Sequence, residues 1–128
     1  MSVLMAEAET VLAGELWRSF RSVLRSYAAA ASLRSEEAAR VEWTESDLTV
    51  AGYAARLELK LDLGSGRGCW HLRVGGEETA HGKFDLLPEG AMDIDGKVQD
   101  LDHAAIDFVA LVTEAEKNHA ARHQGESR

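Results

Sequence analysis

The chain has one cysteine and one proline in 128 residues, and each shortage excludes a class of protein. The lone thiol, Cys69, cannot form a disulfide within the chain, which argues against a disulfide-stabilised secreted domain and indicates a cytoplasmic location. The single Pro88 and the 11 glycines leave no segment with the composition of a long disordered linker. We therefore expect one folded domain, which at this length buries roughly two thirds of the surface of its unfolded chain.

Long apolar runs are missing as well. The longest run of small apolar residues spans 28–31, whereas a membrane helix needs roughly 20 apolar residues. No basic residue precedes Arg18, and no signal-like apolar core is present. The sequence therefore predicts a soluble protein that does not enter a membrane.

Positive charge is in short supply, because 14 lysines and arginines stand against 22 aspartates and glutamates, for a net charge of −8. The excess acid lies mainly in residues 41–100, which hold twelve acidic and six basic side chains. A surface of this sign repels a phosphate backbone, so the sequence argues against a nucleic-acid partner.

The clearest pattern in the chain is an alternation of apolar and polar residues between positions 53 and 63. The apolar set occupies every second position and consists of Tyr53, Ala55, Leu57, Leu59, Leu61 and Leu63. A period of two predicts a β-strand with one apolar and one charged face. Such a strand is typical of an antiparallel sheet whose apolar face is covered by other elements.

The phase of the alternation changes at Gly52, because Leu48 and Val50 are even-numbered and the apolar residues after Gly52 are odd-numbered. A one-residue phase change at a glycine predicts a β-bulge within one strand that runs from Leu48 to Leu63. The alternative is a tight hairpin at Ala51 and Gly52.

The whole chain predicts an α+β fold with both helices packed on one face of the sheet. Further alternating segments and turn signals follow residue 63 without an intervening helix, which indicates an antiparallel meander of about five strands. The expected elements are a helix over residues 3–31, the sheet over 41–98, a second helix over 101–119 and a disordered tail over 120–128.

The first helix has an apolar arc that is wider than one flank of a small sheet needs to cover. Four residues widen it, namely Val11, Trp17, Leu24 and Ala28. We expect them to form a self-association interface, and the alternative is a position deeper in the core of the same chain. Arg18, Arg21 and Arg25 lie together on another side of this helix and indicate a solvated face, with a site for an anion or an acidic partner as the alternative.

No motif for catalysis, a cofactor or a metal ion stands out. The glycine-rich loop at 64–68 joins strand to strand rather than strand to helix, so it predicts a hairpin and not a phosphate-binding loop. Cys69, His71 and His81 share one strand face only if their strands pair in register, and their spacing matches no known zinc signature. We therefore predict no catalytic residues, no metal and no cofactor.

These observations favour a non-enzymatic protein-interaction module over an enzyme. We expect a homodimer that forms through the first helix and offers its acidic sheet to a protein partner. The alternative is a carrier or sensor of a small apolar ligand, with a pocket between sheet and helices. The residues expected to line that pocket are Tyr53, Leu57, Trp70, Phe84 and Phe108. Trp43 is expected in the core if the first strand is in register.

Overall fold

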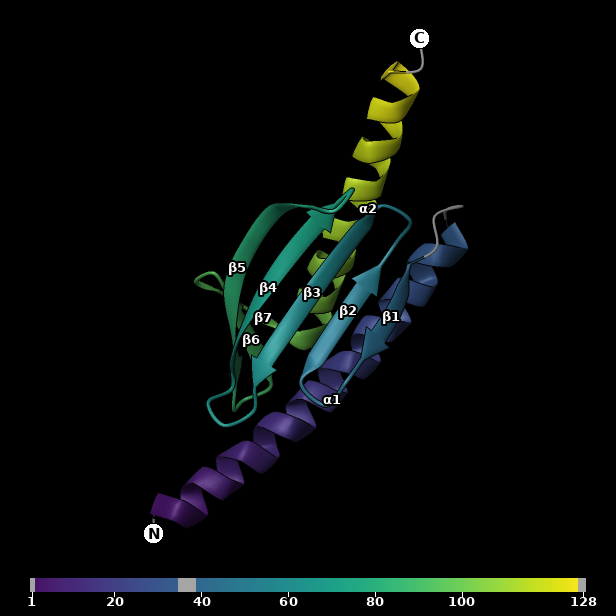
Figure 1. Ribbon diagram of the computed structural model, residues 1–128. Coiled ribbons are helices and arrows are strands. Elements are labelled where there is room, and N and C mark those ends of the chain that lie inside the picture. Colours follow the sequence, from purple (N-terminus) through teal and green to yellow (C-terminus); the bar gives the residue numbers. More distant parts are fainter. Residues whose placement is uncertain (1, 35–38, 127–128) are drawn as a thin grey trace.

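A computed structural model describes residues 2–34 and 39–126, and the side chains of residues 10–33 and 39–122 within them. Helix α1 (Ser2–Arg34) precedes seven strands, and helix α2 (Leu101–Glu126) follows them (Figure 1). The strands are β1 (Arg40–Trp43), β2 (Asp47–Ala51), β3 (Ala55–Asp62), β4 (Arg67–Val74), β5 (Glu77–Leu87), β6 (Ala91–Ile94) and β7 (Lys97–Asp100).

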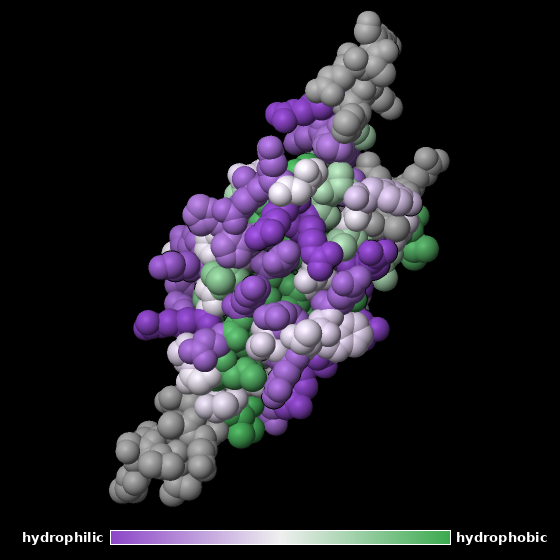
Figure 2. Space-filling view, in the orientation of Figure 1, coloured by the Kyte–Doolittle hydropathy of each residue, from purple (hydrophilic) through white to green (hydrophobic). Residues whose placement is uncertain are grey.

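The strands form one antiparallel sheet in the order of the chain, from β1 at one edge to β7 at the other. This arrangement confirms the predicted α+β class, although the sheet has seven strands rather than about five. Both helices lie behind the sheet in Figure 1, so one sheet face is covered and the other meets solvent. Polar side chains dominate that solvent face (Figure 2).

The predicted alternation is confirmed in β3, where exposed and buried residues follow each other along the strand. Leu57, Leu59 and Leu61 are buried beneath the helices, whereas Arg56 and Lys60 point to solvent. Burying each leucine removes apolar surface from water and stabilises the fold by about 2 kcal/mol. The period of two therefore fixes which face of the sheet receives the helices.

The chain turns at Gly52 instead of forming the predicted β-bulge, so that prediction is wrong and the hairpin alternative is confirmed. The Gly52 N–H donates to the Ala55 carbonyl at 2.9 Å, which separates β2 from β3. Glu116, a buried carboxylate on α2, accepts the N–H groups of Ala54 and Ala55 at 2.6 Å each. A Cβ at residue 52 would lie 2.4 Å from the Glu116 carboxylate, so the absence of a side chain lets α2 hold this turn.

Aromatic rings from both helices and the sheet form the centre of the core. Trp17 of α1 stacks on Phe84 of β5 with ring centroids 5.7 Å apart. Phe108 of α2 meets Phe20 of α1 and Trp70 of β4 edge-on, at 6.2 and 6.0 Å. Because these rings come from the first helix, the sheet and the last helix, the core joins the two ends of the chain.

Helix α2 starts where the sequence predicts, with the Asp100 side chain accepting the His103 N–H at 2.7 Å as an N-cap. It continues to Glu126, whereas the sequence predicts an end at 119 and a disordered tail from 120. Residues 35–38 and 127–128 lie outside the described part.

Candidate functional site

Two arginines of α1 and one tryptophan of β1 form an unusual surface at the edge of the sheet, which we call the Arg–Trp patch (Arg21, Arg25 and Trp43). Arg21 and Arg25 are one helical turn apart and therefore share a face of α1. Their guanidinium carbons lie 5.2 and 4.6 Å from the centroid of the Trp43 ring, within cation–π range. Trp43 remains 44% exposed, whereas Trp17 and Trp70 are buried.

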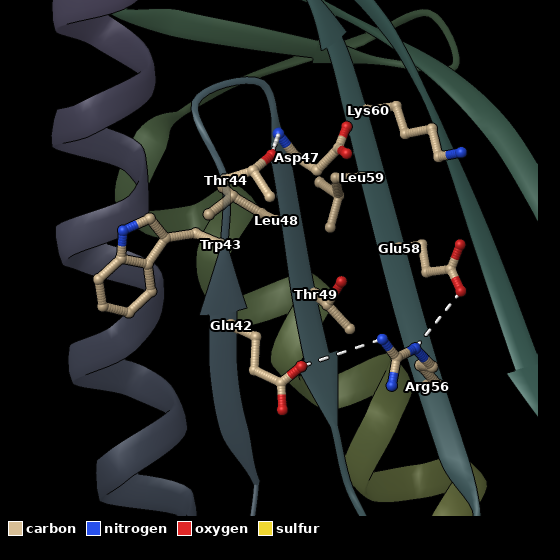
Figure 3. Close-up of a pocket in the computed structure, with 10 residues that line it drawn as sticks. All are labelled: Glu42, Trp43, Thr44, Asp47, Leu48, Thr49, Arg56, Glu58, Leu59 and Lys60. Carbon is tan, nitrogen blue, oxygen red and sulfur yellow. Dashed lines mark hydrogen bonds and ion pairs between the residues drawn. The ribbon is translucent and has the colours of Figure 1, made fainter.

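The position of Trp43 follows from the geometry of an edge strand. Val41 and Trp43 point to the helix side of the sheet, but β1 has a neighbouring strand on one side only. In Figure 3 the Trp43 ring turns toward α1 and away from the side chains of β2 and β3. The prediction of a core position for Trp43 is therefore wrong, because α1 covers only part of the ring.

The arginines of the patch have no carboxylate partner within the described part of the chain. The ion pairs found there involve other residues, and residues 10–33 of α1 hold three arginines against the single Glu15. Two like charges one turn apart repel each other, and no carboxylate of the described residues neutralises them, so stacking on Trp43 offsets part of that cost. The patch is thus a local positive site on a protein of net charge −8.

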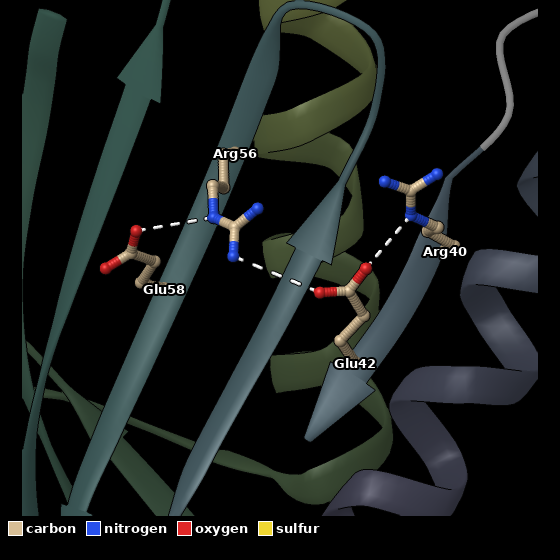
Figure 4. Close-up of polar contacts among 4 residues, drawn as sticks. All are labelled: Arg40, Glu42, Arg56 and Glu58. Atoms are coloured by element: carbon tan, nitrogen blue, oxygen red, sulfur yellow. Dashed lines mark hydrogen bonds and ion pairs between the residues drawn. The ribbon is translucent and has the colours of Figure 1, made fainter. Parts of the chain in front are cut away.

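The solvent face of the neighbouring strands differs, because its charges are paired. Arg40 lies 3.2 Å from Glu42, which lies 4.0 Å from Arg56, and Arg56 lies 3.4 Å from Glu58 (Figure 4). A hollow of about 400 Å³ on β1–β3 includes three of these side chains, Glu42, Arg56 and Glu58. Charges that neutralise each other in this way leave little net field for a ligand.

The structure brings together two of the three residues considered for a metal site. His71 and His81 are register partners on β4 and β5, with ring centroids 6.2 Å apart. Glu78 joins them: it forms a short hydrogen bond with His71 Nδ1 and lies 3.5 Å from His81 Nδ1. Cys69 lies two residues before His71 on β4, and its register partners on the adjacent strands are Lys60 and Lys83.

The hydrogen bond from His71 lowers the pKa of the Glu78 carboxyl, and the charges of His71, His81 and Arg73 act in the same direction against the effect of burial. The sequence did not reveal Glu78. A register shift between Leu72 and Arg73 pairs Glu78 with Arg73, which puts Glu78 on the sheet face that also carries His71. Within the described residues no group of histidine, cysteine and acidic side chains is arranged to hold a metal ion.

Four of the five residues expected to line a ligand pocket pack together in the core, and the fifth lies at the surface. Leu57, Trp70, Phe84 and Phe108 are buried, and their rings and chains fill the region between sheet and helices. Tyr53 is 79% exposed, because it lies in the turn before β3. A separate surface hollow of about 560 Å³, between α2 and the β4–β5 hairpin, is lined by none of these five residues.

Three of the four residues expected at a dimer interface are inside the chain's own core. Trp17, Leu24 and Ala28 are buried against the sheet and α2, which leaves Val11, at 60% exposure, as the member that a second chain can contact directly. The wide apolar arc of α1 thus serves two neighbours within the chain, the sheet and α2. This outcome matches the alternative that the sequence left open.

Comparison with known proteins identifies no relative, since no family model, no curated protein and no solved structure matches the chain. Across the described residues, no helix is long and apolar enough to cross a membrane. The function must therefore be inferred from the surface itself.

Proposed function

We propose that the chain is a non-enzymatic protein-interaction module that binds an acidic protein segment through the Arg–Trp patch. One observation carries the proposal: Trp43 is held half-exposed beneath two guanidinium groups that have no carboxylate partner in the described residues. Tryptophan and arginine are the residue types that most often dominate binding energy at protein interfaces.

The chemistry of the patch suits a carboxylate. A guanidinium that stacks on an aromatic ring keeps its N–H groups free at the edge, where they fit a carboxylate in a two-point hydrogen-bonded pair. The negative charge elsewhere on the chain acts against an acidic partner only over the Debye length, about 8 Å at physiological salt. An acidic segment that lies along the patch therefore meets a positive local field.

Self-association is one form of this proposal, because residues 41–100 of a second copy offer an excess of acidic side chains. The contribution of α1 would then be Arg21 and Arg25 rather than its buried apolar arc. We place this homodimer in the cytoplasm, because its single thiol, Cys69, is half-buried and forms no disulfide within the chain.

A fluorescence titration tests the proposal, because Trp43 is the exposed tryptophan of the three. The probe is a short synthetic peptide rich in glutamate and free of tryptophan, and the matched probe has glutamine at every glutamate. We expect saturable binding of the acidic probe alone, weakened when salt is raised from about 0.05 to 0.5 M.

The double variant Arg21→Gln/Arg25→Gln should lose at least about tenfold in affinity, since each charge-assisted hydrogen bond contributes about 1.5–3 kcal/mol. The matched control is Arg67→Gln/Arg73→Gln, which changes the net charge equally on the opposite face of the sheet and should bind normally. No binding at low salt, or an equal loss in both double variants, would refute the proposal.

Sedimentation velocity over a range of protein concentrations tests the homodimer. We expect a mass that rises above that of one chain and returns to it in Arg21→Gln/Arg25→Gln. A mass of one chain at every concentration removes self-association and leaves an acidic segment of another protein as the partner.

A further inference from the structure

We propose that the acidic segment binds as an added β-strand along the free edge of β1, in the groove between β1 and α1. This inference rests on the proposed function and names the form in which the partner is held. An exposed edge strand offers a row of unpaired N–H and C=O groups, and an extended peptide can complete them.

The hydrogen-bond pattern of the first hairpin shows which groups are free. The Thr44 N–H donates to the Asp47 carbonyl at 3.0 Å, which makes these two residues face each other across the hairpin. In an antiparallel ladder the direction of the backbone groups alternates, so Glu42 faces its partner Thr49 of β2. The N–H and C=O groups of Val41 and Trp43 therefore point away from the sheet.

The next pair of strands supports this assignment. The Leu61 N–H donates to the Ser46 carbonyl at 2.9 Å, which directs Leu48 and Val50 toward β3. Thr49 is thus left to face β1, as the first hairpin requires. Two independent hydrogen bonds give the same alternation.

Helix α1 satisfies the edge at one residue and leaves the next ones open. Ser32 Oγ accepts the Ala39 N–H at 2.8 Å and lies 3.0 Å from the Ala39 carbonyl oxygen. Within the described part of α1, no side chain bonds the backbone of Val41 or Trp43. Ser32 thus hydrogen-bonds the backbone of Ala39, as a neighbouring strand would bond the backbone of Val41 and Trp43.

The space beside this edge is large enough for a peptide backbone. A groove of about 470 Å³ separates β1 from α1, and small side chains of the helix leave it open. Its lining consists of Ser22, Arg25, Ser26, Ala28, Ala29, Ala39, Arg40 and Val41. One arginine of the patch, Arg25, thus reaches into the groove that runs along the free edge.

The charges beside the groove specify the pattern of the added strand. Its side chains would alternate between the helix side, where Arg21 and Arg25 are unpaired, and the solvent side, where Arg40 is already paired with Glu42. Acidic residues are therefore favoured at every second position, and acids at the intervening positions gain little.

The opposite edge of the sheet does not suit the same partner. Strand β7 holds one basic residue, Lys97, and ends at Asp100, and Asp93 and Asp95 lie on β6 and in the β6–β7 turn beside it, so acidic side chains outnumber basic ones at this edge. An acidic strand would meet like charges there. Of the two edges, β1 is the one with complementary charge.

The test compares two peptides of the same charge against the full chain. The first alternates glutamate and threonine, and the second carries an N-methyl group on each glutamate. In an antiparallel pairing the glutamate N–H groups face Val41 and Trp43, so this change removes the main-chain donors toward β1 and keeps every side chain. We expect the first peptide to bind and the second to lose at least about tenfold in affinity. Hydrogen exchange followed by NMR should show new protection at the Val41 and Trp43 amides and unchanged exchange at Glu42.

The outcomes separate this inference from the proposed function. If both peptides bind equally and the Val41 and Trp43 amides exchange as before, strand addition is refuted and the Arg–Trp patch remains a binding surface. If neither peptide binds, the proposed function fails first.

A variant tests the same point from the side of the protein. Val41→Pro removes an N–H that points outward, a position at which an edge strand tolerates proline, so the β1–β2 ladder should persist. The proline ring also occupies the space through which an added strand approaches, so we expect a folded chain by circular dichroism that no longer distinguishes the two peptides. Continued preference for the unmethylated peptide in folded Val41→Pro would overturn the assigned edge.

Discussion

Single side chains link distant parts of this fold, and Glu116 is the clearest case. Its carboxylate is buried and accepts two consecutive N–H groups of the β2–β3 turn, more than 60 positions earlier in the chain. Such a bond replaces the neighbouring strand or water that those N–H groups would otherwise need. One residue of α2 therefore determines the geometry of a turn between strands.

Removing this acceptor should be costly. We expect Glu116→Ala to lower the free energy of unfolding by about 2–4 kcal/mol, because it leaves the Ala54 and Ala55 N–H groups unpaired. Glu116→Gln keeps an acceptor oxygen of the same reach and should lose less than half as much. Urea denaturation measures both variants, and equal losses would show that the charge, not the acceptor, holds the turn.

Trp17 presents the opposite case, since its indole N–H is buried without a hydrogen-bond partner among the described residues. We expect Trp17→Phe to change the free energy of unfolding by less than about 1 kcal/mol, because losing ring volume is offset by removing an unpaired donor. Trp17→Ala should cost about 3–5 kcal/mol through the cavity it leaves. If Trp17→Phe is as costly as Trp17→Ala in urea denaturation, the N–H has a partner after all.

At the scale of elements, the start of α2 depends on the ionised form of its N-cap. The backbone hydrogen bond from His103 lowers the pKa of the Asp100 carboxyl below its ordinary value of 3.8, and a side-chain hydrogen bond from the same residue adds to this effect. A carboxyl with a lowered folded-state pKa stabilises the fold fully above its unfolded pKa. That contribution is lost as the pH falls from about 3.8 through the folded value.

This linkage predicts a difference in acid sensitivity. Asp100→Asn keeps a capping oxygen but removes the charge, so its melting temperature should fall less than that of the wild type as the pH is lowered below 3.8. Thermal unfolding followed at a series of pH values measures the two curves. Parallel curves would show that Asp100 does not titrate with folding.

Sequence patterns predicted the elements better than the connections between them. The period of two identified β3 because Leu57, Leu59 and Leu61 are buried on the same face of the strand. The phase change at Gly52 is the same for a bulge and a hairpin, and the decision comes from Glu116, which no local pattern reveals. The alternation of apolar and polar residues does not predict contacts between residues that are far apart in the sequence.

The sequence predicted the arginines of the candidate site but not the exposed tryptophan. The spacing of Arg21 and Arg25 indicated a shared face of α1, and the alternative of an acidic partner followed from it. Trp43 has the same apolar phase as a core residue, and only its place on the edge strand leaves it exposed. Whether a strand lies at an edge is a property of the whole sheet.

For the molecule as a whole, the sheet order predicts a gradient of stability. Strands β3 and β4 are paired on both sides and lie beneath the helices, whereas β1 and β7 are paired on one side only. We expect native-state hydrogen exchange to be slowest in β3 and β4 and fastest, among strand amides, at outward-facing positions of β1 and β7. Uniform exchange across the sheet would indicate a single cooperative opening instead.

The edge contact of Phe20 with Phe108, at 6.2 Å between ring centroids, also has a consequence during synthesis. The apolar stripe of α1 emerges from the ribosome early, yet α2, one of its two covers, is translated only after the whole sheet. Until α2 is synthesised, the nascent chain exposes an apolar surface of the kind that chaperones recognise.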